Sequence, residues 1–302
     1  MIKGGQDVLD TDFTLSAQAG EALSANDAVY IGSDGKAYKT KGDDMTKINF
    51  KGFVRENTSS GAIAYIVHGR QATGFTGLTA GSLYYMSATA GAISTTPSTF
   101  KKAIGEAIGT TVIKIIDVPY TRIVKFTSSG TWTKYQGLKE ADIIAVGGGG
   151  GGGRWSSSNN NNQAAGGGGA GYAEKFAVAS ELGSTETITV GSGGAGQTGA
   201  PAAGDGTASS FGSLVVAQGG GGADQLTPGA GNPGTTGDIL RKGTSGEFWT
   251  ASSSYGGAGI MGRGGRSPYS PYGDGGMGGE DVGAATDGEA GQNGIVIVIE
   301  KY

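Results

Sequence analysis

The sequence of 302 residues contains no cysteine and only one histidine, His68. Without cysteine the chain can form neither disulfides nor thiolate metal sites, and one histidine cannot supply a multi-histidine metal centre. A Ser-His-Asp triad would have to use His68, and no Gly-x-Ser-x-Gly motif accompanies it. We therefore expect no metal, no cofactor and no catalytic residue, and we interpret His68 as an ordinary strand or turn residue.

Charge is also scarce, since 16% of the residues are charged and the net charge is -4. No basic stripe occurs, so we expect no nucleic-acid partner. The longest late apolar run, Ile295–Ile299, is far too short to span a bilayer. The segment 1–13 holds no apolar stretch, which argues against a secretory signal peptide. We expect no membrane insertion, and release by cell lysis or by assembly into a particle.

Two patterns that could suggest enzyme chemistry have simpler interpretations. The seven glycines of 147–153 are followed by Arg154 and Trp155, whereas a phosphate loop ends in Gly-Lys-Ser/Thr. The adjacent carboxylates Asp43-Asp44 and Glu280-Asp281 lie in polar segments, which is typical of solvated charge. Glycosidases need two placed carboxylates. A polysaccharide depolymerase is thus an alternative for which no site can be named, and we expect a protein that is not an enzyme.

Glycine is what the chain has in abundance, with 63 residues, and its distribution divides the sequence near residue 118. Only 15 glycines lie in 1–118, which leaves 48 for 119–302. The first part contains short apolar segments separated by turn signals, such as 28–31 before Ser-Asp-Gly. A weak repeat with an offset of 53 to 56 residues relates 23–31 (LSANDAVYI) to 78–86 (LTAGSLYYM). Two such units predict a small β-barrel or sandwich.

The second part begins and ends with segments that read as strands. Strand-like segments occur at 121–126, 131–135 and 141–146, and the continuous apolar run at 294–300 is typical of a buried strand. A disordered linker would not need a buried strand at its far end. We therefore expect the glycine tracts between these strands to be folded.

Glycine recurs at every third position within these tracts. A period of three suits a left-handed helix with three residues per turn, whose glycine face lets neighbouring backbones approach closely. Proline is scarce and the register breaks after three or four repeats, which excludes a continuous collagen helix. The fold prediction is a mainly β protein with a β-framed bundle of polyglycine-type threefold helices in its second part. The runs are Gly193, Gly196 and Gly199; Gly231, Gly234 and Gly237; Gly256, Gly259, Gly262 and Gly265; Gly273, Gly276 and Gly279; and Gly288, Gly291 and Gly294.

Aromatic residues in polar tracts are the candidate contact residues. Aromatic rings beside amides and arginines suit sugar stacking or protein recognition, because they offer area at low entropy cost. The alternative is that they fill gaps in a framework with few large side chains, as we expect for Trp132. The candidates for receptor contact are Trp155, Asn159, Asn160, Trp249, Arg263, Arg266, Tyr269 and Tyr272.

Several segments, taken in order, resemble the glycine-rich domain of tailed-phage tail and fibre proteins. The similarity begins with FTSSGTWTK at 126–134 and IIAVGGGGGGG at 143–153. It continues through AGGGGAGY at 165–172 and TITVGSGG at 187–194, and it ends with GQNGIVIVIE at 291–300. The first part is similar to small β modules of phage head fibres, tail fibres and capsid-decorating proteins, through GSLYYMS at 81–87 and GAISTTP at 91–97.

This resemblance implies a virion surface protein, with 1–118 as an attachment module and 119–302 as a display domain. The expected partners are other virion structural proteins of the capsid or tail, further copies in a homotrimer, and a host surface glycan or outer-surface protein. One hypothesis is a spike or fibre adhesin, and the alternative is a capsid decoration or head-fibre protein without a dedicated receptor. No heptads or long strand arrays that could form a shaft occur, which favours a short knob or spike, or the distal part of a larger appendage. An ice-binding surface is disfavoured by the irregular polar loops.

Overall fold

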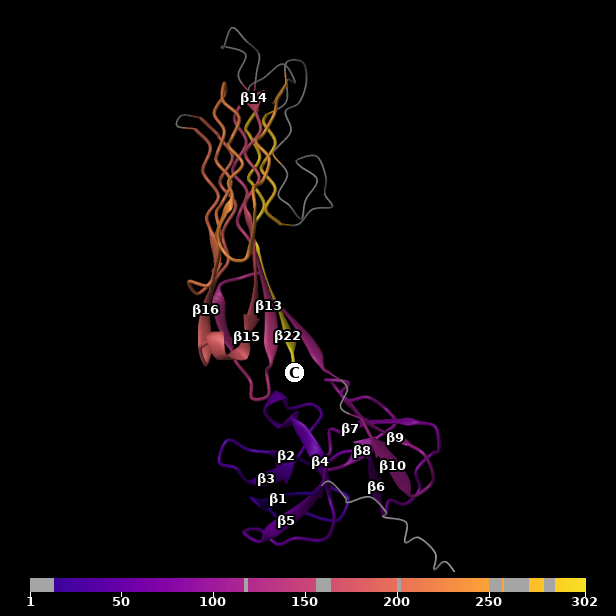
Figure 1. The fold of residues 1–302 in the computed structure, drawn as a ribbon. Coiled ribbons are helices and arrows are strands. Elements are labelled where there is room, and N and C mark those ends of the chain that lie inside the picture. Colours follow the sequence, from indigo (N-terminus) through magenta and orange to yellow (C-terminus); the bar gives the residue numbers. More distant parts are fainter. Residues whose placement is uncertain are drawn as a thin grey trace, which may run out of the picture. The chain divides into compact units, whose positions relative to one another are not determined.

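The structure, a computed structural model, describes residues 14–116, 119–155, 164–199, 202–249, 257, 272–279 and 286–302. The described chain forms four antiparallel sheets of five strands and one of two strands (Figure 1). Its helical pieces are two short 3₁₀ turns, η1 (Met45–Lys47) and η2 (Ala179–Glu181). The predicted mainly β class is therefore confirmed. Within the described residues, no helix is long and apolar enough to cross a membrane.

The chain divides into two compact units. The first extends to Tyr120 and includes Tyr135–Gly137 and Tyr302, and the second contains Thr121–Lys134 and Leu138–Lys301. The first unit contains two sheets with the strand orders β1-β5-β4-β2-β3 and β6-β10-β9-β7-β8. The strands of the first sheet are β1 (Thr14–Gln18), β2 (Ala28–Ile31), β3 (Ala37–Lys39), β4 (Phe50–Val54) and β5 (Ile63–Val67). Those of the second are β6 (Gln71–Thr73), β7 (Leu83–Met86), β8 (Ile93–Ser94), β9 (Ala103–Ala107) and β10 (Val112–Ile115).

The two sheets of the first unit repeat one topology, strand for strand. Val29 on β2 pairs with Gly52 on β4, and Tyr84 on β7 pairs with Gly105 on β9. The pairing register shifts immediately after Val29 in one sheet and after Tyr84 in the other. A shared bulge next to a shared glycine is the structural counterpart of the weak sequence repeat.

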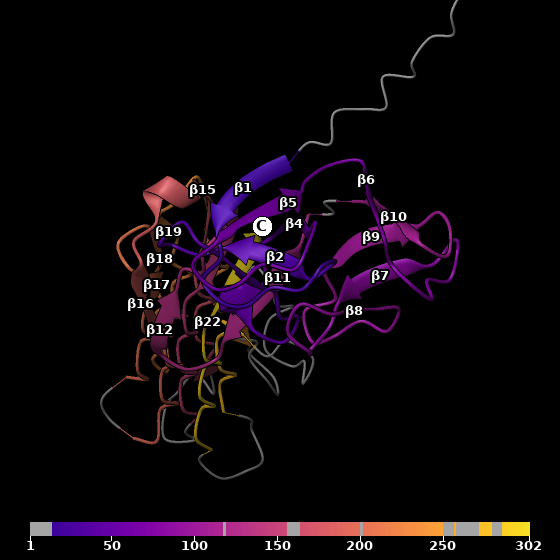
Figure 2. The same cartoon turned by 90° about the horizontal axis from the view of Figure 1, so that it is seen from below.

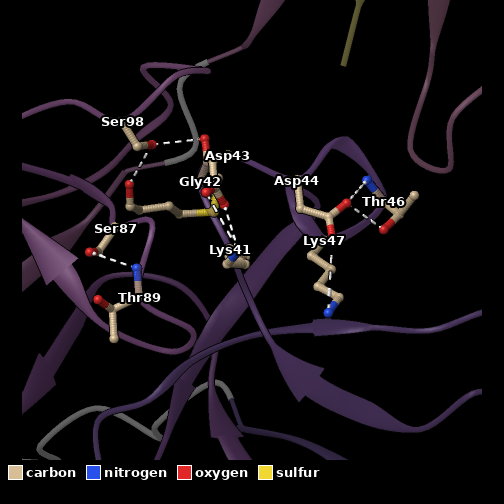
Figure 3. Close-up of polar contacts among 10 residues, drawn as sticks. Lys41, Gly42, Asp43, Asp44, Thr46, Lys47, Ser87, Thr89 and Ser98 are labelled. Carbon is tan, nitrogen blue, oxygen red and sulfur yellow. Dashed lines mark hydrogen bonds and ion pairs between the residues drawn. The ribbon is translucent and has the colours of Figure 1, made fainter.

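The barrel anticipated for 1–118 is not closed. The chain starts a second sheet at β6 instead of continuing the first (Figure 2), and in the first sheet only the isolated bridge of Ala19 to Ala37 joins the edge strands β1 and β3. Hydrogen bonds from the loop after β3 join the two repeats (Figure 3). The amide of Gly42 donates to the Ser87 carbonyl at 2.7 Å, and the Ser98 hydroxyl donates to the carbonyls of Gly42 and Met86, both at 2.8 Å. A side chain at position 42 would collide with Ser98 and the Met86 carbonyl, so the loop requires glycine there.

The second unit contains the other two five-stranded sheets, and they lie against each other. Their orders are β11-β22-β13-β15-β20 and β12-β16-β17-β18-β19. The first is built from β11 (Thr121–Phe126), β22 (Ile295–Lys301), β13 (Glu140–Val146), β15 (Tyr172–Val178) and β20 (Ile239–Arg241). The second is built from β12 (Gly130–Thr133), β16 (Thr185–Thr189), β17 (Ser209–Phe211), β18 (Val215–Ala217) and β19 (Gly234–Thr236). The short strands β14 (Ala164–Ala165) and β21 (Phe248–Trp249) pair with each other.

The core between these two sheets is centred on Trp132. Its ring lies 5.3 Å from that of Phe211, and its indole Nε1 donates to Oε1 of Glu300 at 2.6 Å. Strand β22 is the predicted buried strand, and it lies between β11 and β13 in register over its full length. The strands β13 and β22 lead directly into the glycine segments, which run side by side beyond the sheets (Figure 1). The sheets thus anchor the glycine-rich region at one end.

Candidate functional site

The segment 147–153 lies at the centre of the glycine region, and its amides donate to three neighbouring segments in strict rotation. Gly147, Gly150 and Gly153 donate to residues 171, 168 and 165. Gly148 and Gly151 donate to residues 207 and 204, and Gly149 and Gly152 donate to residues 292 and 289. Each neighbour is therefore reached at every third residue, by bonds of 2.8 to 3.2 Å.

The carbonyls of the same segment accept from three further segments with the same period. Residues 220 and 223 donate to Gly148 and Gly151, residues 194 and 197 to Gly149 and Gly152, and residues 276 and 279 to Gly150 and Gly153. The central segment is thus bonded to six others. These backbone groups are buried, so their pairing avoids the cost of unsatisfied N–H and C=O groups.

Close backbone approach explains why all seven central residues are glycine. A Cβ on any of them would overlap a backbone carbonyl of a neighbouring segment. The obstructing residue is 218, 221 or 224 for Gly147, Gly150 and Gly153, and again the partner advances by three. No side-chain rotamer can relieve such a contact, because the obstacle is main chain.

A second segment, 166–171, repeats this arrangement. Its amides donate in rotation to segments 244–247, 273–276 and 218–221. Its carbonyls accept from 147–153, from residues 229 and 232, and from Gly257. We refer to the hydrogen-bonded glycine segments around 147–153 and 166–171 as the glycine lattice. They form neither α-helices nor β-strands.

Most of the described glycines in the predicted runs lie against backbone. Cβ atoms at Gly193, Gly196, Gly276 and Gly279 would overlap carbonyls of 286–291. Gly273 has φ of +75°, a left-handed conformation that favours glycine, and Gly199 has open space around it. Gly256, Gly259, Gly262 and Gly265 lie outside the described residues.

The chain enters and leaves the lattice at the end far from the sheets in several places. Trp155 forms a bridge with Thr286, and Ala164 pairs with Trp249. Gly153 donates to Ala165 next to these contacts. The chain bordering 156–163, 250–256 and 280–285 therefore meets at one end of the lattice, which we call the lattice tip.

Trp155 lies at this tip, but it is buried, with 4% of its surface exposed. That position matches the alternative interpretation of an aromatic ring that fills the glycine framework. Its neighbour Arg154 donates its backbone amide to the side-chain carbonyl of Gln197 at 2.9 Å, and its guanidinium Nε lies 3.3 Å from Asp287. Polar side chains therefore close this end of the lattice where the glycine pattern stops.

Of the other predicted contact residues, the structure describes only Trp249 and Tyr272, and it places them apart. The backbone of Trp249 lies at the lattice tip, in β21. Tyr272 is half-buried near the sheets, where it packs against the cluster of Val146, Ala170 and Ile295. Asn159, Asn160, Arg263, Arg266 and Tyr269 lie outside the described residues.

A turn at residues 224–227 is a surface feature that the sequence analysis did not single out. Asp224 accepts the Leu226 amide on its side chain at 2.7 Å and donates its own amide to the Thr227 carbonyl at 3.1 Å. The Leu226 side chain is 53% exposed. The turn follows Ala223, which donates to Gly151 in the lattice. The signal was an apolar residue inside the polar tract 223–227, which is too weak to identify alone.

One tyrosine beside the lattice has a strongly shifted ionisation. Burial raises the pKa of Tyr172 to about 12, with a further contribution from the 2.6 Å hydrogen bond that its hydroxyl donates to Glu174. The positive charge of Arg241 lowers the pKa of Tyr172, but by less than these two causes raise it. Within the described residues, no group of three or more His, Cys, Asp or Glu side chains is placed to hold a metal ion. The site offers a hydrogen-bonded scaffold and a surface.

A comparison with protein families agrees with the glycine pattern. The family model of a glycine-rich domain matches residues 125–265, a range that includes the central segment and most of the lattice. No curated protein matches the chain in a sequence search.

Proposed function

We propose that this chain is a phage virion surface protein in which the glycine lattice holds loops toward the host cell. The observation that carries the proposal is the rotation of hydrogen-bond partners around 147–153, which ties six segments to one core. A scaffold bonded in this way is rigid without needing large apolar side chains. Loops that begin and end at the lattice tip are then presented at fixed positions, whatever their own sequence.

In this proposal the lattice segments are left-handed polyglycine-type helices with three residues per turn. Such a helix directs successive N–H groups about 120° apart, so each of three neighbours receives a bond at every third residue. The rotation of partners along both 147–153 and 166–171 has this period. The buried, exposed and half-buried positions of 191–199 also alternate with period three.

The first unit serves in this proposal as the attachment module to the particle. Its two sheets of matched topology, joined by the hydrogen bonds of Gly42 and Ser98, give it a folded core of its own. The activity proposed for the whole chain is adhesion and not catalysis, and its site is the virion surface.

The proposal is tested by locating the chain on the assembled particle. Electron microscopy of particles carrying a peptide tag on the chain should place the label at the tail or spike tip. The purified chain should also compete with particles for attachment to host cells. A label distributed over the capsid faces, without competition, would overturn the adhesin and favour a capsid decoration protein.

A further inference from the structure

The outer face of the sheet β11-β22-β13-β15-β20 carries more apolar side chains than an exposed sheet face normally does. Antiparallel sheets with one wet face alternate apolar and polar residues along each strand. On β22, Ile297 and Ile299 face away from the core that buries Val296 and Val298, and both are only half-buried. Ile295 faces the same way but is already buried against Val146 and Ala170. The uncovered part of β22 therefore presents isoleucine, with Lys301 at its end, where a solvent-facing strand would present polar residues.

Exposed apolar side chains on neighbouring strands extend the same face. Ile123 on β11 is 59% exposed and Phe176 on β15 is 52% exposed. They lie in one cross-strand row, because Ile123 pairs with Ile299, Ile299 with Asp142, and Asp142 with Phe176. A hollow of about 180 Å³ lies beside the Phe176 ring, lined by Val178, Ala177 and the charged side chains of Glu140, Asp142 and Lys301.

Charge on this face is divided between its two halves. The basic residues Lys125 and Lys301 lie on β11 and β22, whereas the acidic residues Glu140, Asp142 and Glu174 lie on β13 and β15. Arg241, at the end of the edge strand β20, is the exception to this division. Lys301 already bonds to Asp142 at 3.0 Å across the boundary between the halves.

We propose that this face pairs with the same face of a second copy of the chain. A two-fold axis parallel to the strands, between β22 and β13, places β11 of one copy over β15 of the other and β22 over β13. Each cross-strand row of one copy then faces the same row of the other copy. Lys125 meets Glu174 of the second copy, since both lie in the row of Ile297 and Ile144, and Ile123 meets Phe176. The basic half of each copy covers the acidic half of the other, which is the self-complementarity that an isologous interface requires.

The area of the face determines how strong a dimer we expect. Five strands spaced about 4.8 Å apart span a width of about 20 Å, and the longest of them, β13, β15 and β22 with seven residues each, are about 23 Å long. The face therefore offers at most about 460 Å² per partner. Standard specific interfaces bury about 800 Å² per partner, so this contact belongs to the weak, transient class. The pairing is therefore a reversible dimer that dissociates on dilution. It is distinct from the homotrimer expected by resemblance, and it does not rest on the proposed function.

The test is the mass of the full chain in solution, measured by sedimentation over a range of concentrations. One copy has a mass of 29.9 kDa, so the weight-average mass should rise toward about 60 kDa, twice that value, with increasing concentration. Phe176→Glu should weaken the dimer at least tenfold. Leu226→Glu is the matched control, because its side chain is equally exposed in the same unit but lies far from the sheet.

Charge reversal provides a second arm that does not depend on apolar contact. Lys125→Glu should weaken the dimer at low salt, and the double variant Lys125→Glu with Glu174→Lys should regain most of the loss. A wild-type mass of one copy at every concentration, or of three copies, would overturn the proposal. Equal effects of Phe176→Glu and Leu226→Glu, or no recovery in the double variant, would do so as well.

Discussion

The indole of Trp132 donates a 2.6 Å hydrogen bond to the carboxylate of Glu300, which is completely buried between the two sheets of the second unit. Arg122 holds the other carboxylate oxygen at 3.1 Å. The bond joins β12 in one sheet to β22 in the other, near the end of β22 that lies away from the glycine lattice, since the lattice adjoins β22 at Ile295.

Replacement of Trp132 by phenylalanine should therefore cost more than the change in volume alone. The ring is kept, but a hydrogen bond to a buried charged group is lost, which is worth about 1.5–3 kcal/mol. We expect the free energy of unfolding in urea to fall by about that amount. The companion variant Phe211→Leu alters the same core without touching Glu300, and if it lowered stability as much, the hydrogen bond would not be the cause.

Gly150→Ala should disrupt the lattice, because its Cβ would overlap the Gly221 carbonyl. Overpacking of a tight interior costs about 1–3 kcal/mol even where side chains can yield, and here the obstacle is backbone. Gly199→Ala is the control, since nothing lies within 4 Å of a Cβ there. Thermal unfolding should shift strongly for the first variant and hardly for the second. Equal melting temperatures would contradict the polyglycine proposal.

The equivalent glycines of the repeated sheets should differ in their tolerance of alanine. A Cβ at Gly52 would overlap the Val67 carbonyl, whereas a Cβ at Gly105 would overlap the Ile113 side chain and lie 3.1 Å from the Lys114 carbonyl. A side chain can change rotamer and a ladder carbonyl cannot. We therefore expect Gly52→Ala to lower the free energy of unfolding more than Gly105→Ala does. The reverse order in denaturant titrations would show that the two sheets are not equivalent at this position.

Tyr172 should make stability fall at alkaline pH. Its folded pKa of about 12 exceeds the usual value of 10, so the neutral hydroxyl is favoured in the folded chain. The resulting stabilisation is complete below pH 10 and is lost as pH rises through 12. Ultraviolet titration should reveal a late-ionising tyrosine that disappears in Tyr172→Phe. The stability of that variant should also decline less than that of the wild type between pH 10 and 12.

Trp155→Ala should destabilise the chain, because the ring is buried where the lattice ends. Removal of a buried tryptophan side chain costs about 3–5 kcal/mol. Leu226→Ala, at an exposed position on the neighbouring turn, should change stability by less than about 0.5 kcal/mol. Circular dichroism melting curves of both variants provide the comparison. An unchanged curve for Trp155→Ala would place the indole in solvent and return it to the set of contact candidates.

Local signals in the sequence identified the longer strands, but not short ones such as β3, β6 and β20. The apolar segments at 28–31, 121–126 and 141–146 correspond to β2, β11 and β13, because alternation and turn residues act over a few positions. The three-residue spacing of glycine also predicts positions where neighbouring backbones approach closely, and Gly193 and Gly196 do lie against backbone. Gly199 fits the same spacing and has open space, since the pattern cannot show where a segment leaves its neighbours.

What the sequence could not provide was the pairing of distant segments. No local pattern indicates that Gly149 bonds to Gln292, or that the first part forms two separate five-stranded sheets of the same topology. The burial of Trp155 likewise depends on Thr286, which is remote along the chain. The outward isoleucines of β22 were visible as a continuous apolar run, but only the sheet order shows which side of that run remains uncovered.

The rotation of partners along 147–153 also limits how such a scaffold can change length during evolution. An insertion of one or two residues in a lattice segment would pair each amide with the wrong neighbour, whereas an insertion of three would restore the rotation. In the threefold helices proposed above, three residues would lengthen the segment by about 9 Å at 3.1 Å per residue. The chain beyond the lattice tip is not bound by this rule, so in the proposed display domain the tip would shift only in steps while the chain beyond it is free to diversify in length and composition.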